Sequence, residues 1–279
     1  MKINKNKQDN PSLYGFHAVR EAWLNPERTI HALYLTDQAK SGFEPVLLEG
    51  KRRGLRRQPP IMLDKHRLEK MLPQGAVHQG VALAASPPEE YALQDLIIRA
   101  HSREGRTVLL MLDQVTDPHN VGAILRSACA LGSGGVIMQR KHAPLLTGVL
   151  AKTACGAVEH IPVAFETNLS RSIEALKDEG FFIYGLDERG TRTIGEITSG
   201  RSGTGAASGR HKDKDLLAVP PKTPVQEKIL LVLGAEGAGI RHLVREKCDE
   251  LVRLPTAEPI ASLNVSNAAA VALYALLQK

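Results

Sequence analysis

The sequence has few cysteines, few closely spaced histidines and no long apolar run. Cys129, Cys155 and Cys248 are too few and too scattered for a disulfide framework or a CxxC zinc site. The histidines are not spaced as pairs of metal ligands. No apolar run approaches the ~18 residues of a membrane-spanning helix, and the polar start MKINKNKQDNPS lacks the apolar segment of a signal peptide. We therefore expect a cytoplasmic protein with no bound metal and no membrane partner.

Two common nucleotide-binding motifs are also missing. The region after residue 107 has no GxGxxG following its first expected strand, and no GxxxxGK[ST] occurs in the chain. A standard dinucleotide-binding site and a phosphate-binding P-loop are therefore disfavoured. The same absence argues against a nucleotide-dependent oxidoreductase.

The composition is that of a globular protein with a basic surface. Of the 279 residues, 43% are hydrophobic and 24% are charged, which excludes a fibrous or wholly disordered chain. The length suits one large domain or two ordinary ones. Lysine and arginine (36) exceed aspartate and glutamate (30), which gives a net charge of +6 and favours a polyanionic partner.

Changes in pattern along the chain predict two domains and two flexible segments. Residues 1–12 are polar and predict a flexible basic arm, and residues 13–85 alternate short helices and strands as in a small α/β domain. Residues 86–106 are expected to form a linker with one short helix. Strand–helix alternation over 107–279 predicts a parallel sheet covered by helices. Within it, the Gly/Ser-rich stretch 195–226 is expected to be a flexible insertion.

Individual elements follow from the apolar patterns. VLLMLD (108–113) is a continuous apolar run, typical of a strand buried on both faces, and KILLVLG (228–234) predicts another strand. Helices are expected over 16–24, 43–53 and 121–131. The last helix, 264–277, is apolar nearly all round and is therefore expected to bury more than one face.

Three segments place polar groups at the carboxyl ends of expected strands, where open α/β sheets bind ligands. Taken singly, each polar group has an ordinary structural explanation. Asn120 suits a helix N-cap, Arg126 suits a helix edge, and Glu236 suits a glycine-rich turn. Ser262 and Asn264 suit the cap of the last helix. Their joint occurrence at three strand ends favours one shared cleft.

The segments that carry these residues resemble a known family. DPHNVGAILRSA, KTACGAVEHIPV, LGAEGAG and SLNVSNAAAVAL are similar to the motifs of the SpoU/TrmH branch of the SPOUT superfamily, S-adenosylmethionine-dependent RNA ribose 2′-O-methyltransferases. LYGFHAVREAW and GAVHQGVAL resemble the start and end of the L30e-like RNA-binding domain of its rRNA-modifying members. The resemblance implies an α/β fold. A small N-terminal L30e-like domain would precede a C-terminal trefoil-knotted (α/β-knot) domain with a parallel sheet.

The resemblance also implies a set of site residues. By motif position, the catalytic set is Arg126, Asn120, Glu236, Ser262 and Asn264, and the cofactor-binding set is Gly234, Leu254 and Leu263. Arg126 is either a general base or an electrostatic orienter of the ribose, and the sequence leaves both roles open, since arginine loses its proton with difficulty. Gly234 is expected to permit close backbone approach. TAEPIASLN lacks the glycine that the family commonly has before SLN.

The resemblance finally implies a cofactor, a substrate and an assembly. The expected cofactor is S-adenosylmethionine, and the expected partner is RNA, most specifically a guanosine in the P-site loop of 23S rRNA. A homodimer is expected, in which each site borrows residues from the partner. The alternatives are a tRNA 2′-O-methyltransferase of the same family and a non-catalytic RNA-binding module.

Overall fold

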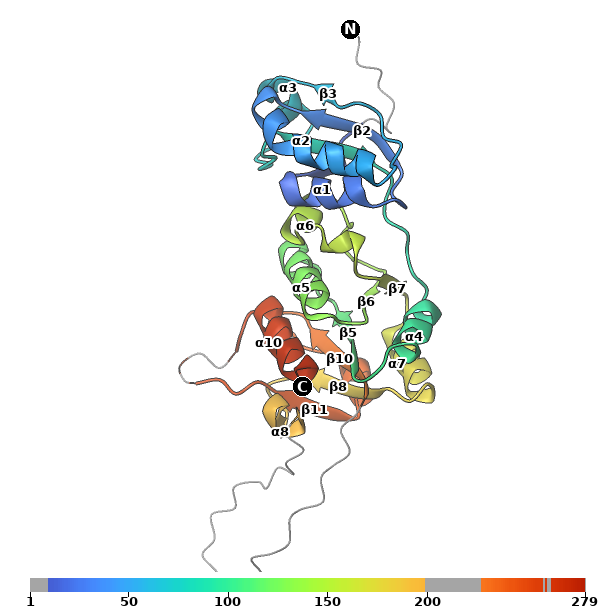
Figure 1. Cartoon of the computed structure of the whole chain (residues 1–279). Helices are drawn as coiled ribbons and strands as arrows, with labels where there is room; N and C mark the ends of the chain where they lie inside the picture. The colour runs from blue at the N-terminus through green and yellow to red at the C-terminus, as the bar shows by residue number, and fades with distance from the viewer. Residues whose placement is uncertain (1–9, 199–226, 258, 260–261, 279) are drawn as a thin grey trace, which may run out of the picture. The chain divides into compact units, whose positions relative to one another are not determined.

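The computed structural model describes residues 10–198, 227–257, 259 and 262–278. The described chain divides into two compact units, whose elements are labelled in Figure 1. The first unit comprises the chain up to Tyr91 together with Thr116–Ala130 and His142–Val163, and the second comprises Ala92–Val115, Leu131–Lys141 and the chain from Ala164 onward.

The first unit contains a four-stranded mixed sheet with helices. Its strand order is β1-β4-β2-β3, in which β4 pairs antiparallel with β1 and β2, and β2 pairs parallel with β3. The strands are β1 (Leu13–Tyr14), β2 (Ile30–Leu35), β3 (Ile61–Met62) and β4 (Val81–Ala85). The helices are α1 (Phe16–Leu24), α2 (Asp37–Arg52), α3 (Lys65–Lys70), α5 (Pro118–Leu131), α6 (Gly148–Thr153) and the short 3₁₀ helix η2 (Ala157–Glu159).

Helix α2 begins six residues earlier than the sequence pattern predicts. Pro45 lies inside it, and a proline in a helix interior normally costs one backbone hydrogen bond. Phe43 and Val46 are nevertheless buried, so packing outweighs that local cost. Asp37 in the first turn also suits the positive end of the helix dipole.

The second unit is built on a seven-stranded sheet. Its order is β7-β6-β5-β10-β8-β11-β9, and the pairs β6/β5, β5/β10, β10/β8, β8/β11 and β11/β9 are parallel. The parallel sheet predicted for this part of the chain is confirmed. The strands are β5 (Thr107–Asp113), β6 (Gly135–Gln139), β7 (Val163–Glu166), β8 (Phe182–Leu186), β9 (Arg192–Thr193), β10 (Lys228–Gly234) and β11 (Glu250–Arg253).

The described residues of the second unit form five helices: α4 (Leu93–His101), α7 (Leu169–Asp178), α8 (Ile194–Thr198), α9 (His242–Glu246) and α10 (Val265–Leu277). Helix α4 is the helix predicted within the linker, and it buries Leu96, Ile97 and Ala100. Lys228 Nζ donates to the carbonyl of Ala100 at 2.6 Å, which attaches α4 to β10. Helix α8 occupies the first residues of the expected insertion. Residues 199–226 and 1–9 lie outside the described part of the chain.

Within the described ranges, no helix has the length and apolar character required to cross a membrane. The same residues contain no group of three histidine, cysteine or acidic side chains placed to hold a metal ion. The three cysteines are free, and burial raises the pKa of the Cys248 thiol to about 12, so this thiol is a poor nucleophile. The trefoil knot, the cellular location and the absence of a metal stay predictions.

Candidate active site

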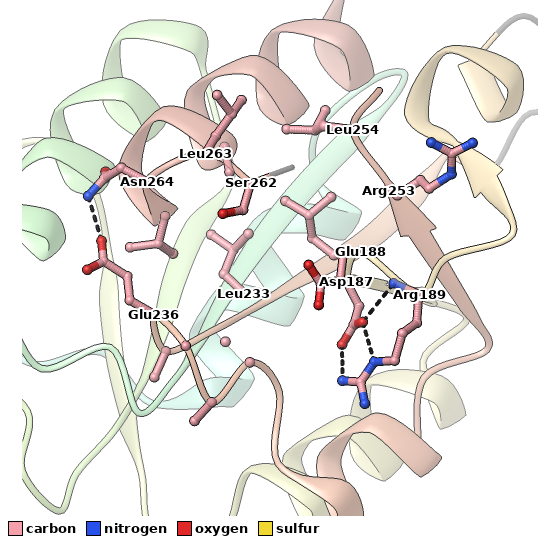
Figure 2. A pocket seen from close by; sticks show the side chains of 18 of the residues that line it. Asp187, Glu188, Arg189, Leu233, Glu236, Arg253, Leu254, Ser262, Leu263 and Asn264 are labelled. Atoms are coloured by element: carbon pink, nitrogen blue, oxygen red, sulfur yellow. Dashed lines mark hydrogen bonds and ion pairs between the residues drawn. The ribbon is translucent and has the colours of Figure 1, made fainter. Parts of the chain in front are cut away.

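A pocket of about 540 Å³ lies at the carboxyl ends of three neighbouring strands of the second unit. Its wall is formed by the ends of β8, β10 and β11 and the residues that follow each strand (186–189, 233–239 and 253–256), together with residues that lead into α10 (Figure 2). Ligands of parallel α/β sheets bind at this edge because the strand-end loops meet there. The pocket therefore has the position expected of a ligand site.

Six of the eight predicted site residues line this pocket. They are Gly234, Glu236, Leu254, Ser262, Leu263 and Asn264. The other two, Asn120 and Arg126, lie on α5, which belongs to the first unit. Two of the three sequence segments thus meet in one pocket. The chemical roles of all eight residues stay predictions at this point.

The floor of the pocket is a tight turn after β10. The amide of Gly239 donates to the carbonyl of Ala235 at 2.8 Å, and Gly237 and Gly239 adopt positive φ angles of 75° and 67°. A Cβ atom on Gly234 would lie 2.1 Å from the carbonyl carbon of Gly239. Gly234 therefore does permit a close backbone approach, and the approaching backbone is the chain's own turn.

An ion pair between a buried carboxylate and a partly exposed arginine fixes the far end of this turn. Asp113 ends β5 beside Gly234, and its side chain is fully buried. Its Oδ2 accepts from the Arg241 amide at 2.8 Å, and its Oδ1 accepts from Arg241 Nε at 2.6 Å. Neither residue belonged to the predicted site. The only signal for Asp113 was its place at the end of an apolar strand.

Asn264 links the last helix to the turn across the pocket mouth. It is the N-cap of α10, where its Oδ1 accepts from the Ser266 amide at 2.9 Å, so the capping role is confirmed. Its Nδ2 also donates to Glu236 Oε1 at 2.5 Å (Figure 2). The side chains of Ser262 and Leu263 are exposed at the same mouth. Residues 258, 260 and 261, where the family's usual glycine is missing, lie outside the described residues.

An acidic group that the sequence analysis missed forms another wall. The buried carboxylate of Asp187 accepts from Arg189 Nε and Nη2, both at 2.7 Å, and this pairing holds its pKa below the usual range. Neighbouring Glu188 is exposed and also lines the pocket. Both follow β8, a strand whose end carries no glycine or amide motif. Recognising them required the sheet order, which places β8 beside β10.

Helix α5 begins differently from the prediction. It starts at Pro118, so Asn120 lies in its first turn and is not the N-cap. The carboxylate of Asp117 accepts from the amides of His119 and Asn120, at 3.2 Å each. The capping explanation for Asn120 is therefore wrong, because Asp117 supplies that acceptor. Arg126 is exposed on the same helix, and no described acidic residue forms a salt bridge with it.

Comparison with known proteins gives matches over nearly the whole chain. Residues 107–274 match the SpoU rRNA Methylase family, and residues 12–91 match the family described as RNA 2′-O ribose methyltransferase substrate binding. The 23S rRNA (guanosine-2′-O-)-methyltransferase RlmB of Pseudomonas aeruginosa is 37% identical over 96% of both chains. A Synechocystis protein named as an uncharacterized tRNA/rRNA methyltransferase is 33% identical over 96% of this chain, which spans 62% of that longer protein.

A solved structure shows the same fold. The SpoU methyltransferase AviRb from Streptomyces viridochromogenes, in complex with AdoMet, aligns with a TM-score of 0.69 over 99% of this chain and 93% of its own. At 22% identity this likeness shows the fold alone. Together with the two family matches, it confirms the expected α/β fold with a small N-terminal domain and a C-terminal parallel sheet. The chain belongs to the SpoU rRNA methylase family, whose members are RNA 2′-O-ribose methyltransferases.

Proposed function

We propose that the enzyme methylates the ribose 2′-hydroxyl of a guanosine in the P-site loop of 23S rRNA. Relatives support this choice of substrate. Several proteins named as 23S rRNA (guanosine-2′-O-)-methyltransferases match this chain at 34–37% identity over about 95% of both chains. The observation that carries the chemistry is the pocket at the ends of β8, β10 and β11. It gathers six of the site residues that the family motifs imply.

The pocket fits S-adenosylmethionine in size and lining. Its volume of about 540 Å³ is within the ~300–1,000 Å³ of sites for small molecules. Leu233, Leu254 and Leu263 supply apolar surface, and the turn at 235–239 supplies backbone amides and carbonyls. The carboxylate of Glu188 offers a negative charge to a cationic ligand. When bound, the cofactor supplies a methyl group that is already electrophilic.

The remaining task of the protein is to align the 2′-hydroxyl with that methyl group, and positioning of this kind can supply roughly 7–11 kcal/mol. We assign Arg126 to the ribose because arginine presents a planar set of donors and stays charged in proteins. Asn120 and Arg126 are six positions apart on α5, which places them roughly 120° apart around the helix, on different faces. We assign Asn120 to holding the RNA strand. Glu236 and Asn264 hold each other, which keeps the mouth of the pocket in shape.

Replacing Gly234 with alanine is expected to weaken cofactor binding. The added Cβ would lie 2.1 Å from the backbone of Gly239, so the turn must move, and overpacking of this kind costs about 1–3 kcal/mol. We expect the Kd for S-adenosylmethionine to rise about tenfold or more by titration calorimetry. Gly195→Ala is the matched control, because its Cβ would meet only Thr193 Oγ1 at 3.9 Å. An unchanged Kd for a folded Gly234→Ala protein would contradict the role of this turn.

The substrate assignment is tested by single-turnover transfer from labelled S-adenosylmethionine to unmodified 23S rRNA and, separately, to unmodified tRNA. We expect label in the rRNA, at one alkali-resistant linkage after a guanosine, because 2′-O-methylation blocks attack of that oxygen on its phosphate. Transfer to tRNA alone would replace the proposed substrate with the tRNA alternative.

We further propose that the enzyme is a homodimer that contacts its partner through α10. The helix buries Ala269, Leu273 and Leu276 on one face, while Val271 and Tyr274 are 48% and 58% exposed on another. Light scattering is expected to give twice the 30.3 kDa chain mass for the wild type and a lower mass for Tyr274→Glu. Ile98→Glu on α4 is the control, because Ile98 is equally exposed, at 58%. An active wild-type monomer would contradict the proposal.

A further inference from the structure

A second recess, also of about 540 Å³, lies within the first unit, and the functional assignments above leave it unexplained. Four parts of the chain line it: β1 with the start of α1, the loop at 75–79, α5, and α6 with the residues that follow it. Arg126 is one of its lining residues. The residue proposed to act on the ribose therefore shares a cavity with the substrate-binding region at the N-terminus.

The described ionisable side chains that line this recess include basic groups and no carboxylates. Its ionisable nitrogen-bearing side chains are His17, His119, Arg126 and Lys152, and no aspartate or glutamate is among the described residues that line it. None of the four has a salt bridge to a described acidic residue, so their donors are available to an anion. A cavity with only basic and neutral walls concentrates negatively charged ligands.

Lys152 is held over the backbone at the start of α1. Gly15 has a φ of 89°, and a Cβ placed on it would lie 3.3 Å from Lys152 Cγ and 3.5 Å from Gln79 Oε1. Gln79 Oε1 in turn accepts from the Phe16 amide at 3.0 Å. The absence of a side chain at Gly15 thus leaves room for the lysine stem, which packs across the junction between α6 and α1.

The recess also has an apolar wall. Val77 is 60% exposed, and it lines the recess together with Ala76 and Val149. Basic groups beside apolar surface match a nucleic acid strand, whose phosphates are charged and whose sugars and bases have apolar faces. The combination favours RNA over a small inorganic anion.

We propose that this recess binds the phosphodiester backbone next to the methylated nucleotide, with Lys152 as a phosphate contact. The inference rests on the proposed function, because it needs an RNA strand whose ribose reaches Arg126. Lysine binds phosphate as a point charge. Its contribution to RNA affinity therefore depends on its positive charge and not on a planar arrangement of donors. The recess thereby sets which ribose along the strand is presented to Arg126.

The test measures RNA affinity by fluorescence anisotropy as a function of salt concentration, with a labelled P-site-loop RNA. One phosphate contact contributes about 0.7 to the slope of log K against log salt for a single strand. Lys152→Gln is expected to weaken binding and to lower the slope by about that amount, and Lys152→Arg is expected to keep both. Lys70→Gln removes an exposed charge of the same unit outside the recess and is expected to match the wild type.

Two further readouts separate this inference from the proposed function. Calorimetric binding of S-adenosylmethionine and the thermal unfolding midpoint are expected to be unchanged in Lys152→Gln. Wild-type affinity and slope in Lys152→Gln, with normal methyl transfer by the wild type, would overturn the recess proposal and leave the enzyme assignment intact. A wild-type protein that binds the cofactor but transfers no methyl group to 23S rRNA would overturn the proposed function itself.

Discussion

Replacing Arg126 with alanine is expected to slow single-turnover methyl transfer by about 10²-fold or more, while the Kd for S-adenosylmethionine stays the same. The expectation follows from where the side chain lies. Arg126 is exposed on α5 and lines the basic recess of the first unit, whereas the proposed cofactor pocket is lined entirely by residues of the second unit. Its loss should therefore affect the ribose hydroxyl and not the cofactor.

Arg126→Lys distinguishes the two roles that the sequence leaves open. An orienter that uses a planar fork of donors tolerates lysine poorly, because lysine offers a single point charge. A general base would be partly rescued, since lysine loses its proton more readily than arginine, and the rate would then rise with pH. We expect little rescue between neutral and alkaline pH. A wild-type rate in Arg126→Ala would remove Arg126 from the mechanism.

Replacing Arg28 with alanine is expected to lower the free energy of unfolding by about 3–5 kcal/mol. Arg28 Nε lies 3.2 Å from Glu159 Oε1, and their side chains are 3% and 2% exposed. Asn25 Nδ2 donates to the other Glu159 oxygen at 2.9 Å, and Arg28 Nη1 donates to the carbonyl of Ser86 at 2.7 Å. Removing the guanidinium leaves a buried carboxylate without its counter-charge.

The pH dependence of this loss has a defined sign. Burial raises the pKa of Glu159, and Arg28 partly offsets that effect. Without Arg28, the pKa of Glu159 in the folded protein rises further above its value in the unfolded chain. The free energy of unfolding of the Arg28→Ala variant therefore increases, relative to that of the wild type, as the Glu159 carboxyl becomes protonated. The difference in unfolding free energy between wild type and variant should therefore shrink toward acidic pH.

Urea unfolding at several pH values measures this effect. Arg20→Ala is the matched control, because Arg20 is 45% exposed in its 3.2 Å pair with Glu21, and exposed pairs contribute about 0–1 kcal/mol. The double variant Arg28→Met with Glu159→Leu is expected to recover much of the loss, since it leaves no buried charge. A loss below about 1 kcal/mol for Arg28→Ala would show that the pair is not buried in solution.

The sequence predicts the central sheet, and the meeting of two strand-end segments in one pocket, for clear physical reasons. KILLVLG predicts β10 with its observed bounds, because a strand buried on both faces must be apolar throughout. Glu236 and Asn264 were predicted to share a cleft because strand ends of a parallel sheet meet at one edge, and the hydrogen bond between them confirms it. Helix ends were less accurate, as the early start of α2 illustrates.

What the sequence did not predict depends on long-range geometry. Arg28 and Glu159 are 131 positions apart, and the local sequence around each residue does not predict that the two form a buried ion pair. Asp187 lines the pocket only because β8, an earlier strand in the chain, lies next to β10 in the sheet. The basic recess likewise combines residues from four separate segments, so no local pattern could have indicated it.

The central claim, that this enzyme methylates a guanosine of 23S rRNA, is tested most directly by a map of ribose methylation in 23S rRNA from a strain in which the gene for this protein is deleted. We predict that one guanosine of the P-site loop loses its 2′-O-methyl group, and that the wild-type gene restores it while Arg126→Ala does not. A 23S rRNA map identical to that of the parent strain, with a 2′-O-methyl group missing from a tRNA, would contradict the account.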